Sequence, residues 1–422
     1  MLLVQRIKIK TTKEQELVLD GQSKTCNWTY NQFLEARINC YKWFGKSYGY
    51  YDCNAYLPEF KDEHPFLKTV YSQVLKETLR VLDKAYANFF RRVRERAEEP
   101  GFPHFKSWKR KWFPLIYTRD KGYKLLDDNT MKITLGKDVQ GNQLSQVLNL
   151  NQPITHPMES CHGLVITKVK ANYYLSAIFE VPPPEKVEIK TTVGIDPNQK
   201  NVFVGVDTNG KAIKMDGKGV APYFDKQIDK VKGRRDKCQR HSRRKSRYTE
   251  ALDRLYSKRR DQTKLMCYTV ANALARDYDM VAYGDYTPNA ADIKKKNGDP
   301  AKKANKRINH SCLAQGIVGQ LRRTVEWVCE KKGKTFERVN EYRTTRTCSN
   351  CGYVFPDGLG TSVRVFNCPK CHSQIDRDAN SGINILRRTR HETPGVLCAV
   401  NWEWSPFSGL QVNPSTMVYN IL

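Results

Sequence analysis

The chain lacks the long apolar segments on which membrane proteins depend. No run of about 18 apolar residues occurs in its 422 residues, and the opening MLLVQRIKIKTTKEQ is too short in apolar residues for a secretory signal. No amphipathic anchor accompanies the basic charge either. We therefore expect no membrane partner.

Acidic residues are scarce as well. The sequence has 44 Asp and Glu against 72 Lys and Arg, for a formal net charge of +28. Solubility does not require such a surplus, and a polyanionic partner, nucleic acid, explains it best. The 39% hydrophobic content excludes general disorder, and the length predicts two to four domains.

Histidine, the commonest metal ligand, is also rare. The eight histidines show no metal-binding spacing, and no Ser/His/Asp or Cys/His nucleophile pattern occurs. What the sequence does have is two cysteine pairs, Cys348-Ser-Asn-Cys351 and Cys368-Pro-Lys-Cys371, separated by sixteen residues. This spacing predicts a structural zinc ribbon; redox-active or disulfide pairs are the alternatives. The other nine cysteines are scattered, which is typical of a reducing compartment.

The first 190 residues show three patterns in succession. Residues 3–10 alternate as a strand does, and residues 13–96 have helical periodicity, clearest at 69–90. Short alternating runs from 115 to 182 predict a small β-barrel or sandwich, and the prolines at 182–184 mark a boundary.

Aromatic and basic residues interleave in the segment 101–113, which contains Lys106, Trp108 and Lys109. Aromatic faces stack on bases while cations meet phosphates, so this composition indicates a nucleic-acid surface. A basic strand with inward aromatics is the alternative.

A second basic region extends from Lys226 to Lys264. One predicted helix face collects four arginines, which suits the tracking of phosphates, although a solvated charged helix has the same composition. These residues are Arg240, Arg243, Arg244 and Arg247. We also expect a mobile basic loop at 290–307.

Residues 191–207 predict two strands joined by a turn, with Asp196 ending the first. A carboxylate at that point is how RNase H-like folds hold a divalent metal, although Asp-Pro-Asn is also an ordinary turn. Further strands are expected at 279–285 and 334–341, and a helix at 311–332.

Several of these motifs together resemble the TnpB proteins of insertion sequences, their eukaryotic Fanzor relatives and the miniature type V CRISPR effectors. The resemblance rests on Gly194-Ile-Asp196, on both cysteine pairs, and on Asp376-Arg-Asp378-Ala-Asn-Ser-Gly-Ile-Asn384-Ile385. Weaker similarity covers most of residues 1–388. The family consists of RNA-guided DNA nucleases with a split RuvC (RNase H-like) core and an inserted zinc ribbon.

The resemblance implies a multidomain α+β fold. Its expected parts are a β-barrel (1–12 and 97–185), a helical recognition domain (13–96), a RuvC nuclease domain (186–346 and 374–390), a zinc ribbon (347–373) and a tail (391–422). The tail matches nothing in the family.

The resemblance also implies the catalytic residues. Asp196, Glu341 and Asp378 would hold catalytic Mg²⁺, with Arg377 contacting phosphate and Asp376 orienting its loop, although Asp376 and Asp378 could exchange roles. The family usually has a glutamate where this chain has Gly284. Either activity is lost, or Glu341 replaces that glutamate from a strand beside the Asp196 strand; Asp285 is the alternate ligand.

The expected partners are a guide RNA and a target DNA, in a prokaryotic cytoplasm or a eukaryotic nucleus. A guided binder that no longer cuts and an unguided zinc-ribbon RNA-binding protein are the competing hypotheses. The sequence leaves the guide, the flanking DNA motif and the choice between monomer and homodimer open.

Overall fold

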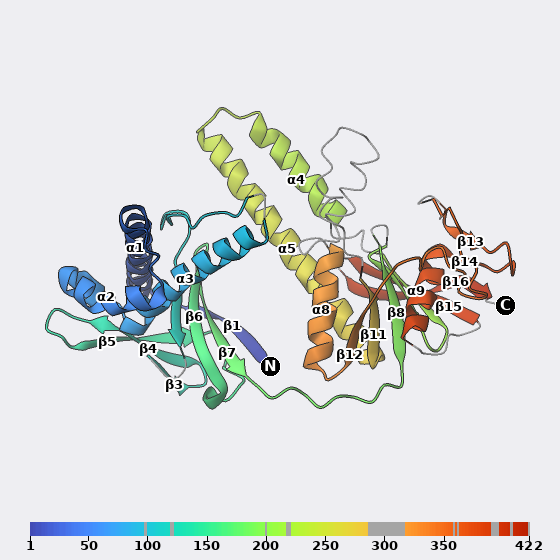
Figure 1. The fold of residues 1–422 in the computed structure, drawn as a ribbon, viewed down its shortest axis with the longest axis horizontal. Coiled ribbons are helices and arrows are strands. Elements are labelled where there is room, and N and C mark those ends of the chain that lie inside the picture. Colours follow the sequence, from blue (N-terminus) through green and yellow to red (C-terminus); the bar gives the residue numbers. More distant parts are fainter. Residues whose placement is uncertain are drawn as a thin grey trace. The chain divides into compact units, whose positions relative to one another are not determined.

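The chain folds into two compact units, Met1–Pro182 and Pro183–Leu422. The computed structural model describes residues 1–96, 99–118, 122–198, 201–216, 221–285, 317–357, 359–360, 363–389, 396–405 and 408–420 (Figure 1). The expected basic loop at 290–307 lies outside these residues.

Strand β1 (Leu2–Lys10) lies in the middle of the first unit's sheet although it begins the chain. It pairs antiparallel with β7 (Asn172–Glu180) on one side and β5 (Gln143–Leu150) on the other. The sheet order is β2-β6-β7-β1-β5-β4-β3. The remaining strands are β2 (Leu115–Thr118), β3 (Tyr123–Asp127), β4 (Thr130–Lys137) and β6 (Cys161–Val169).

No ladder joins the end strands β2 and β3 within the described residues, so a closed barrel stays a prediction for this unit.

Three helices share a hydrophobic core with this sheet: α1 (Lys13–Phe44), α2 (Tyr50–Glu63) and α3 (Ser72–Arg94). Thr12 and Gln15 form a capping box at the start of α1, and Gly45 ends the helix with a left-handed φ of 64°. The helical periodicity of residues 13–96 is thus confirmed, divided into separate helices.

The second unit has a seven-stranded sheet in the order β12-β11-β8-β9-β10-β15-β16. Strands β8 (Thr192–Pro197), β11 (Met280–Gly284) and β12 (Thr335–Val339) are parallel. Strand β9 (Phe203–Asp207) is antiparallel to both β8 and β10 (Lys211–Asp216). The two expected strands of residues 191–207 are therefore present.

Helices pack on both faces of this sheet. Helices α5 (Arg243–Asp277) and α8 (Ile317–Lys331) bury apolar residues against Val193 and Ile195 of β8. Helix α9 (Arg377–Arg388) packs on the other face, where Ile385 contacts Ala282 and Val339. Because side chains alternate along a strand, Asp196 and Gly284 lie on the α9 face.

The last strands, β15 (Val396–Ser405) and β16 (Gly409–Asn420), were not expected from the sequence. They form an antiparallel pair, and β15 continues the sheet by pairing in parallel with β10. The tail thus belongs to the second unit's sheet.

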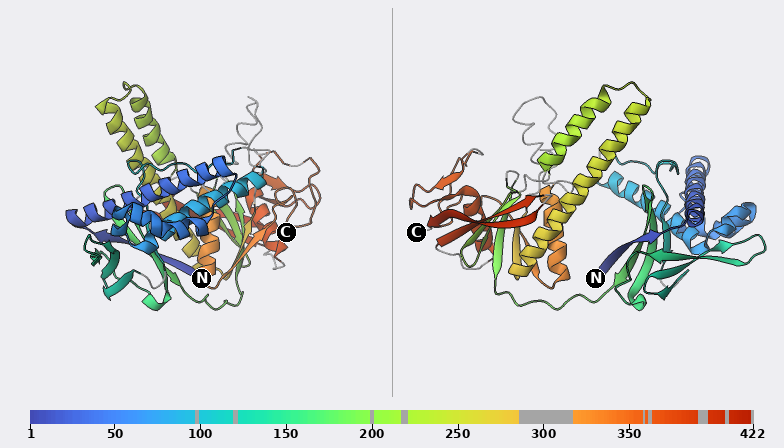
Figure 2. Two further views of the ribbon diagram at one scale, coloured as in Figure 1. Left: turned by 60° about the vertical axis from the view of Figure 1, so that its left-hand side comes forward. Right: turned by 180° about the vertical axis from the view of Figure 1, so that it is seen from behind.

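Helix α4 (Ala221–Asp236) packs along α5 as an antiparallel pair that extends away from this sheet (Figures 1 and 2). Within the described chain, every helix is too short or too polar to cross a bilayer.

Candidate active site and metal centre

Asp196 is the next-to-last residue of β8 and is 5% exposed. Its Oδ1 lies 3.0 Å from Ser381 Oγ of α9. Burial raises the pKa of this carboxyl group above its ordinary value, and the charge of Asp378 raises the pKa further. Two buried acids in such mutual repulsion are typical of a site for cations.

Asp378 lies in the first turn of α9 and is 4% exposed. Asp376 is the N-cap of this helix, because its Oδ1 accepts hydrogen bonds from the backbone N–H groups of Asp378 (2.9 Å) and Ala379 (3.1 Å). Arg364 and Arg377 each approach the Asp378 carboxylate to 3.4 Å. Asp376 therefore caps the helical turn that contains Asp378.

Glu341 lies just beyond β12, and its side chain extends over Gly284 of β11. A Cβ atom at residue 284 would lie 2.1 Å from Glu341 Oε1 and 2.8 Å from its Cδ and Cγ. The missing side chain of Gly284 thus leaves the space that the Glu341 carboxyl group fills.

The backbone around Glu341 is held on both sides. Arg388 of α9 donates hydrogen bonds to the carbonyl oxygens of Asn340 and Tyr342. Thr344 donates its hydroxyl to the Glu341 carbonyl at 3.0 Å. One oxygen of the carboxyl group is unsatisfied, since the buried Oε1 has no hydrogen-bond partner. Burial raises its pKa, and the charge of Asp196 adds to this effect.

One topological expectation was wrong: the strand before Glu341 does not lie beside the Asp196 strand. Strand β12 pairs with β11, and β11 pairs with β8. Glu341 shares a face with Asp196 across an intervening strand, which is possible because residue 284 is a glycine. Asp285, the alternate ligand, forms an ion pair with Arg322 of α8 at 2.5 Å.

These acids suit divalent cations. The unpartnered buried oxygen on Glu341 and the raised pKa values of Asp196 and Glu341 fit a site whose carboxylates share a bound cation. In the described part of the chain, only the cysteine quartet brings three or more ligand groups within 4.8 Å of one another.

Helix α9 joins the acidic cluster to the cysteine-rich loop. Asn384 Nδ2 donates to the carbonyl oxygens of Thr344 (2.8 Å) and Thr347 (2.7 Å), and Asn380 Nδ2 also donates to Thr347 O at 2.8 Å. Gly194 lets the helix pack on β8, because a Cβ there would lie 2.5 Å from Gly382 O. Sequence reasoning missed these roles and that of Ser381. The helical spacing of residues 377, 381 and 384 was the signal available.

Cys348, Cys351, Cys368 and Cys371 bring their sulfur atoms within 4.8 Å of one another. Two contacts, Cys348 to Cys371 at 3.7 Å and Cys351 to Cys368 at 3.5 Å, are far longer than the ~2.05 Å of a disulfide. They match the ~3.8 Å edge of a tetrahedron of sulfurs around zinc. The thiols are free, so the quartet could hold zinc.

The two cysteine knuckles have the same backbone design. Cys348 N donates to Tyr353 O and Gly352 N to Cys348 O; Cys368 N donates to Ser373 O and His372 N to Cys368 O. Gly352 and His372 both have left-handed φ values, 74° and 60°. Hydrogen bonds from Ser373 lower the pKa of Cys371 to about 5, which favours the ligating thiolate.

The predicted nucleic-acid residues lie in three places. Arg377 contacts Asp378 and donates to Gly360 O at 3.1 Å. Arg243, Arg244 and Arg247 lie exposed on the first turns of α5, before its first buried residue, Leu252. Arg240 does not share their helix, because Ser242 caps α5 and His241 has a left-handed φ of 65°.

The remaining three predicted nucleic-acid residues lie in the first unit. Trp108 and Lys109 are exposed. The Lys106 ammonium instead lies 3.7 Å from the ring centroid of Tyr30, and burial lowers its pKa to about 8.

Known proteins similar to this chain were found by sequence and by structure. Residues 319–385, which include Glu341, the cysteine quartet and Asp378, match the family described as Cas12f1-like, TNB domain. A TnpB-like protein, L79 of Acanthamoeba polyphaga mimivirus, is 31% identical over 163 residues, which are 38% of this chain and 30% of that protein. Over those 163 residues the chain is similar to the TnpB-like proteins.

Two other proteins match over more of their length. A Streptomyces pristinaespiralis protein named "Putative RNA-guided DNA endonuclease" is 24% identical over 384 residues, covering 89% of this chain and 86% of that protein. The Cas12f1 chain from a cryo-EM structure with sgRNA and target DNA has a TM-score of 0.59 at 15% identity, over 89% of this chain and 83% of that one. This likeness shows a shared fold.

Proposed function

We propose that this chain is an RNA-guided DNA endonuclease whose site is rearranged onto Glu341. The observation that carries the proposal is the Glu341 carboxyl group, which occupies the space left open by Gly284 and has a buried Oε1 without a hydrogen-bond partner. A chain that had merely lost a catalytic glutamate would have no reason to keep an acid with a buried, unpartnered oxygen there, because such an oxygen has an energetic cost.

The second unit would be the nuclease part. Its strands β10-β9-β8-β11-β12, with β9 alone antiparallel, follow the order of an RNase H-like core, and residues 347–373 would form an inserted zinc ribbon. The ribbon's zinc would be structural. The first unit would contain the recognition helices and the barrel-like sheet that grip a guide RNA and its duplex with DNA.

Asp196, Glu341 and Asp378 would hold Mg²⁺, which when bound activates water for attack on a phosphodiester and stabilises the leaving oxygen. Ser381 orients the Asp196 carboxylate, and Asp376 presents Asp378 from the helix start. Arg377, whose guanidinium lies 3.4 Å from the Asp378 carboxylate, could contact a DNA phosphate.

The test begins with sequencing of the RNA that co-purifies with the protein expressed beside its flanking locus. The complex is then incubated with Mg²⁺ and DNA matching that RNA. We expect one enriched RNA and cleavage that falls more than about 100-fold in Asp196→Ala and Glu341→Ala, because removal of a ligand should exceed the 10–100-fold cost of removing a ligand's partner. Both variants should still bind the DNA.

A swap variant tests the rearrangement itself. Gly284→Glu combined with Glu341→Ala returns a carboxylate to β11 and should recover part of the cleavage that Glu341→Ala alone loses. If neither Asp196→Ala nor Glu341→Ala changes the outcome, the chain is a guided binder that does not cut. A mixture of unrelated RNAs would instead support an unguided RNA-binding protein. The site of action would be a prokaryotic cytoplasm or a eukaryotic nucleus.

A further inference from the structure

The first unit has a strongly basic pocket of about 1020 Å³. Seven Lys or Arg side chains line it, and they come from β1 (Arg6), α1 (Lys24), the segment 109–111 and the end of β6 with its following turn (Lys168 and Lys170). Cations from four places in the chain converge there. A concave surface of one charge attracts a polyanion more strongly than the same charges spread over a flat face do.

The one acidic lining residue is occupied within the protein. Asp20 accepts hydrogen bonds from Lys168 Nζ at 2.8 Å, Tyr173 OH at 2.7 Å and Trp112 Nε1 at 2.9 Å. It therefore offsets Lys168 and positions Trp112, and the pocket keeps a large positive surplus.

Trp108 supplies an aromatic face among these cations. Its side chain is 52% exposed, and the ammonium groups of Lys24 and Lys109 lie 4.7 and 5.8 Å from its ring centroid. An exposed indole flanked by cations is the arrangement on which an unpaired base stacks while its phosphates are neutralised.

The segment that contains Trp108 is tied down at both ends. Before it, Lys106 N donates to Asn31 Oδ1 at 2.8 Å; after it, Phe113 N donates to Ser23 Oγ at 2.7 Å. Since α1 provides both anchors, the segment is preorganised, and a ligand does not have to order it on binding.

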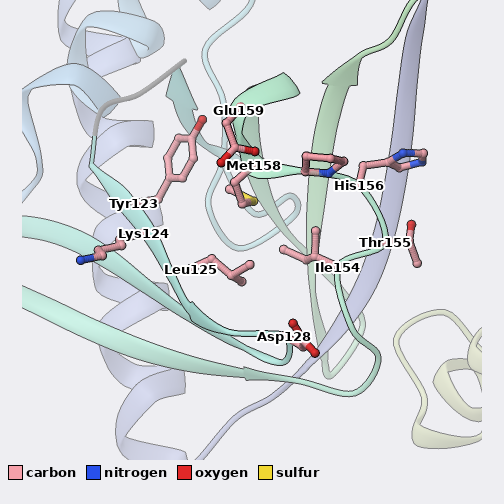
Figure 3. Close-up of a pocket in the computed structure, with 10 residues that line it drawn as sticks. Tyr123, Lys124, Leu125, Asp128, Ile154, Thr155, His156, Met158 and Glu159 are labelled. Atoms are coloured by element: carbon pink, nitrogen blue, oxygen red, sulfur yellow. The ribbon is translucent and has the colours of Figure 1, made fainter.

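A second pocket in the same unit provides a contrast. It measures about 650 Å³ and is lined by Lys124 together with two acids, Asp128 and Glu159 (Figure 3). That balance gives a polyanion no net attraction. The basic character of the first pocket is thus a local feature of the unit.

We propose that the basic pocket binds an unpaired nucleotide, with its base stacked on Trp108 and the neighbouring phosphates on the surrounding lysines and arginines. The inference rests on the proposed function only for its partner, a guide RNA. The pocket chemistry itself is shared by single strands of RNA and DNA.

The experiment uses the full chain, stripped of nucleic acid at high salt and kept in EDTA so that no strand is cut. Three labelled probes of one sequence carry 5-bromouracil: a single-stranded RNA, a single-stranded DNA and the duplex DNA. After irradiation, cross-linked peptides are identified by mass spectrometry. We expect both single strands to cross-link at Trp108 and the duplex to do so at least tenfold less.

Trp108→Ala should weaken binding of the single strands about tenfold, and Trp108→Phe should retain most of the affinity. The matched control is Trp43→Ala, which removes a tryptophan of α1 that is 72% exposed and does not line the pocket. It should leave the affinity for the single strands unchanged. Stronger RNA than DNA cross-linking would identify the guide as the partner, and the reverse would identify the target strand.

Equal cross-linking of duplex and single strands, or full affinity in Trp108→Ala, would overturn the proposal. Asp196→Ala should cross-link as the unmodified protein does. A chain that fails to cleave but cross-links at Trp108 would therefore refute the proposed function and leave the pocket standing.

Discussion

Gly284 and Glu341 depend on each other within the acidic cluster. The Glu341 carboxyl group occupies the volume that any other residue at 284 would need for its Cβ. That Cβ would lie 2.1 Å from Glu341 Oε1. The glycine is thus part of the site although it has no functional group.

Gly284→Ala should therefore displace the Glu341 side chain while leaving the fold intact. We expect cleavage to fall at least about tenfold, with the free energy of unfolding changed by less than about 1 kcal/mol, because a flexible side chain can move aside. Guided cleavage assays and urea unfolding measure the two effects.

Gly233→Ala in α4 is the matched control, because nothing lies within 4 Å of its Cβ position. It should stabilise the protein by about 0.5–1 kcal/mol and leave cleavage unchanged. Equal losses of cleavage in both variants would contradict the role of Gly284.

For single residues, the sequence predicted the positions that follow from local structure. Asp196 ends a strand and the cysteines form knuckles, so their neighbours in sequence define their geometry. Arg240 could not be placed correctly, because a serine cap and a left-handed residue separate it from α5. Partners such as Ser381 and Arg388 depend on contacts between distant segments.

Among the elements, the three parallel strands are joined at their starts by Asp279. Its carboxylate accepts hydrogen bonds from the Lys190 and Thr191 backbone, each at 3.1 Å, and from Lys334 Nζ at 2.7 Å. The bond from Lys334 is the main cause that lowers the pKa of Asp279 to about 2.

Because the pKa of Asp279 is lower in the folded protein, its carboxylate stabilises the fold at pH values above the ordinary pKa of 3.8. This stabilisation is lost as the pH falls toward 2. Asp279→Asn should therefore cost up to about 2.5 kcal/mol at pH 7 and progressively less below pH 4. Urea unfolding of both proteins across this pH range measures the difference.

Asp277→Asn is the comparison for this experiment. Asp277 pairs with Arg276, which is 73% exposed, so its replacement should cost less than about 1 kcal/mol. A pH-independent difference between Asp279→Asn and the unmodified protein would contradict the linkage.

The cysteine loop should depend on its metal. Cys348 and Cys368 share a hydrophobic cluster with Val206 of β9 and Ile383 of α9, so loss of zinc should loosen the base of α9. We expect Cys368→Ser to lower bound zinc from about one per chain to none and to abolish cleavage. Zinc analysis and limited proteolysis of residues 340–376 check this.

Cys238→Ser, a partly exposed cysteine outside the quartet, should leave the zinc content unchanged. Zinc retained by Cys368→Ser would contradict the assignment of the quartet.

Strand adjacency was the element-scale feature that the sequence did not predict. Periodicity identified strands near 279–285 and 334–341, but it does not give the order of the strands in the sheet. The insertion of β11 between β8 and β12 follows from the crossover through α5 and α8, which only the assembled sheet defines.

For the whole molecule, the two units have separate cores, and their boundary falls at Pro182 and Pro183, as the proline run predicted. A fragment of residues 1–182 should therefore unfold in one cooperative transition by circular dichroism, since β1, β5 and β7 are all present in it. A fragment that begins after residue 10 lacks the central strand and should not fold. A non-cooperative 1–182 fragment would contradict the division.

The last strands show the limit of sequence reasoning at this scale. Residues 391–422 resembled no family segment, yet β15 pairs with β10 and β16 forms the edge of the second unit's sheet. An added edge strand needs no motif beyond a partner with free backbone groups.

Asp196, Glu341 and Asp378 are separated by about 180 residues of sequence. At a synthesis rate of about 5–20 residues per second, the ribosome needs roughly 10–40 s to make that stretch. A nascent or truncated chain that stops before α9 would lack the full acid set. Translation itself would thus delay the proposed nuclease activity until α9 has left the ribosome, so that partly made chains would not cut the DNA near the site of synthesis.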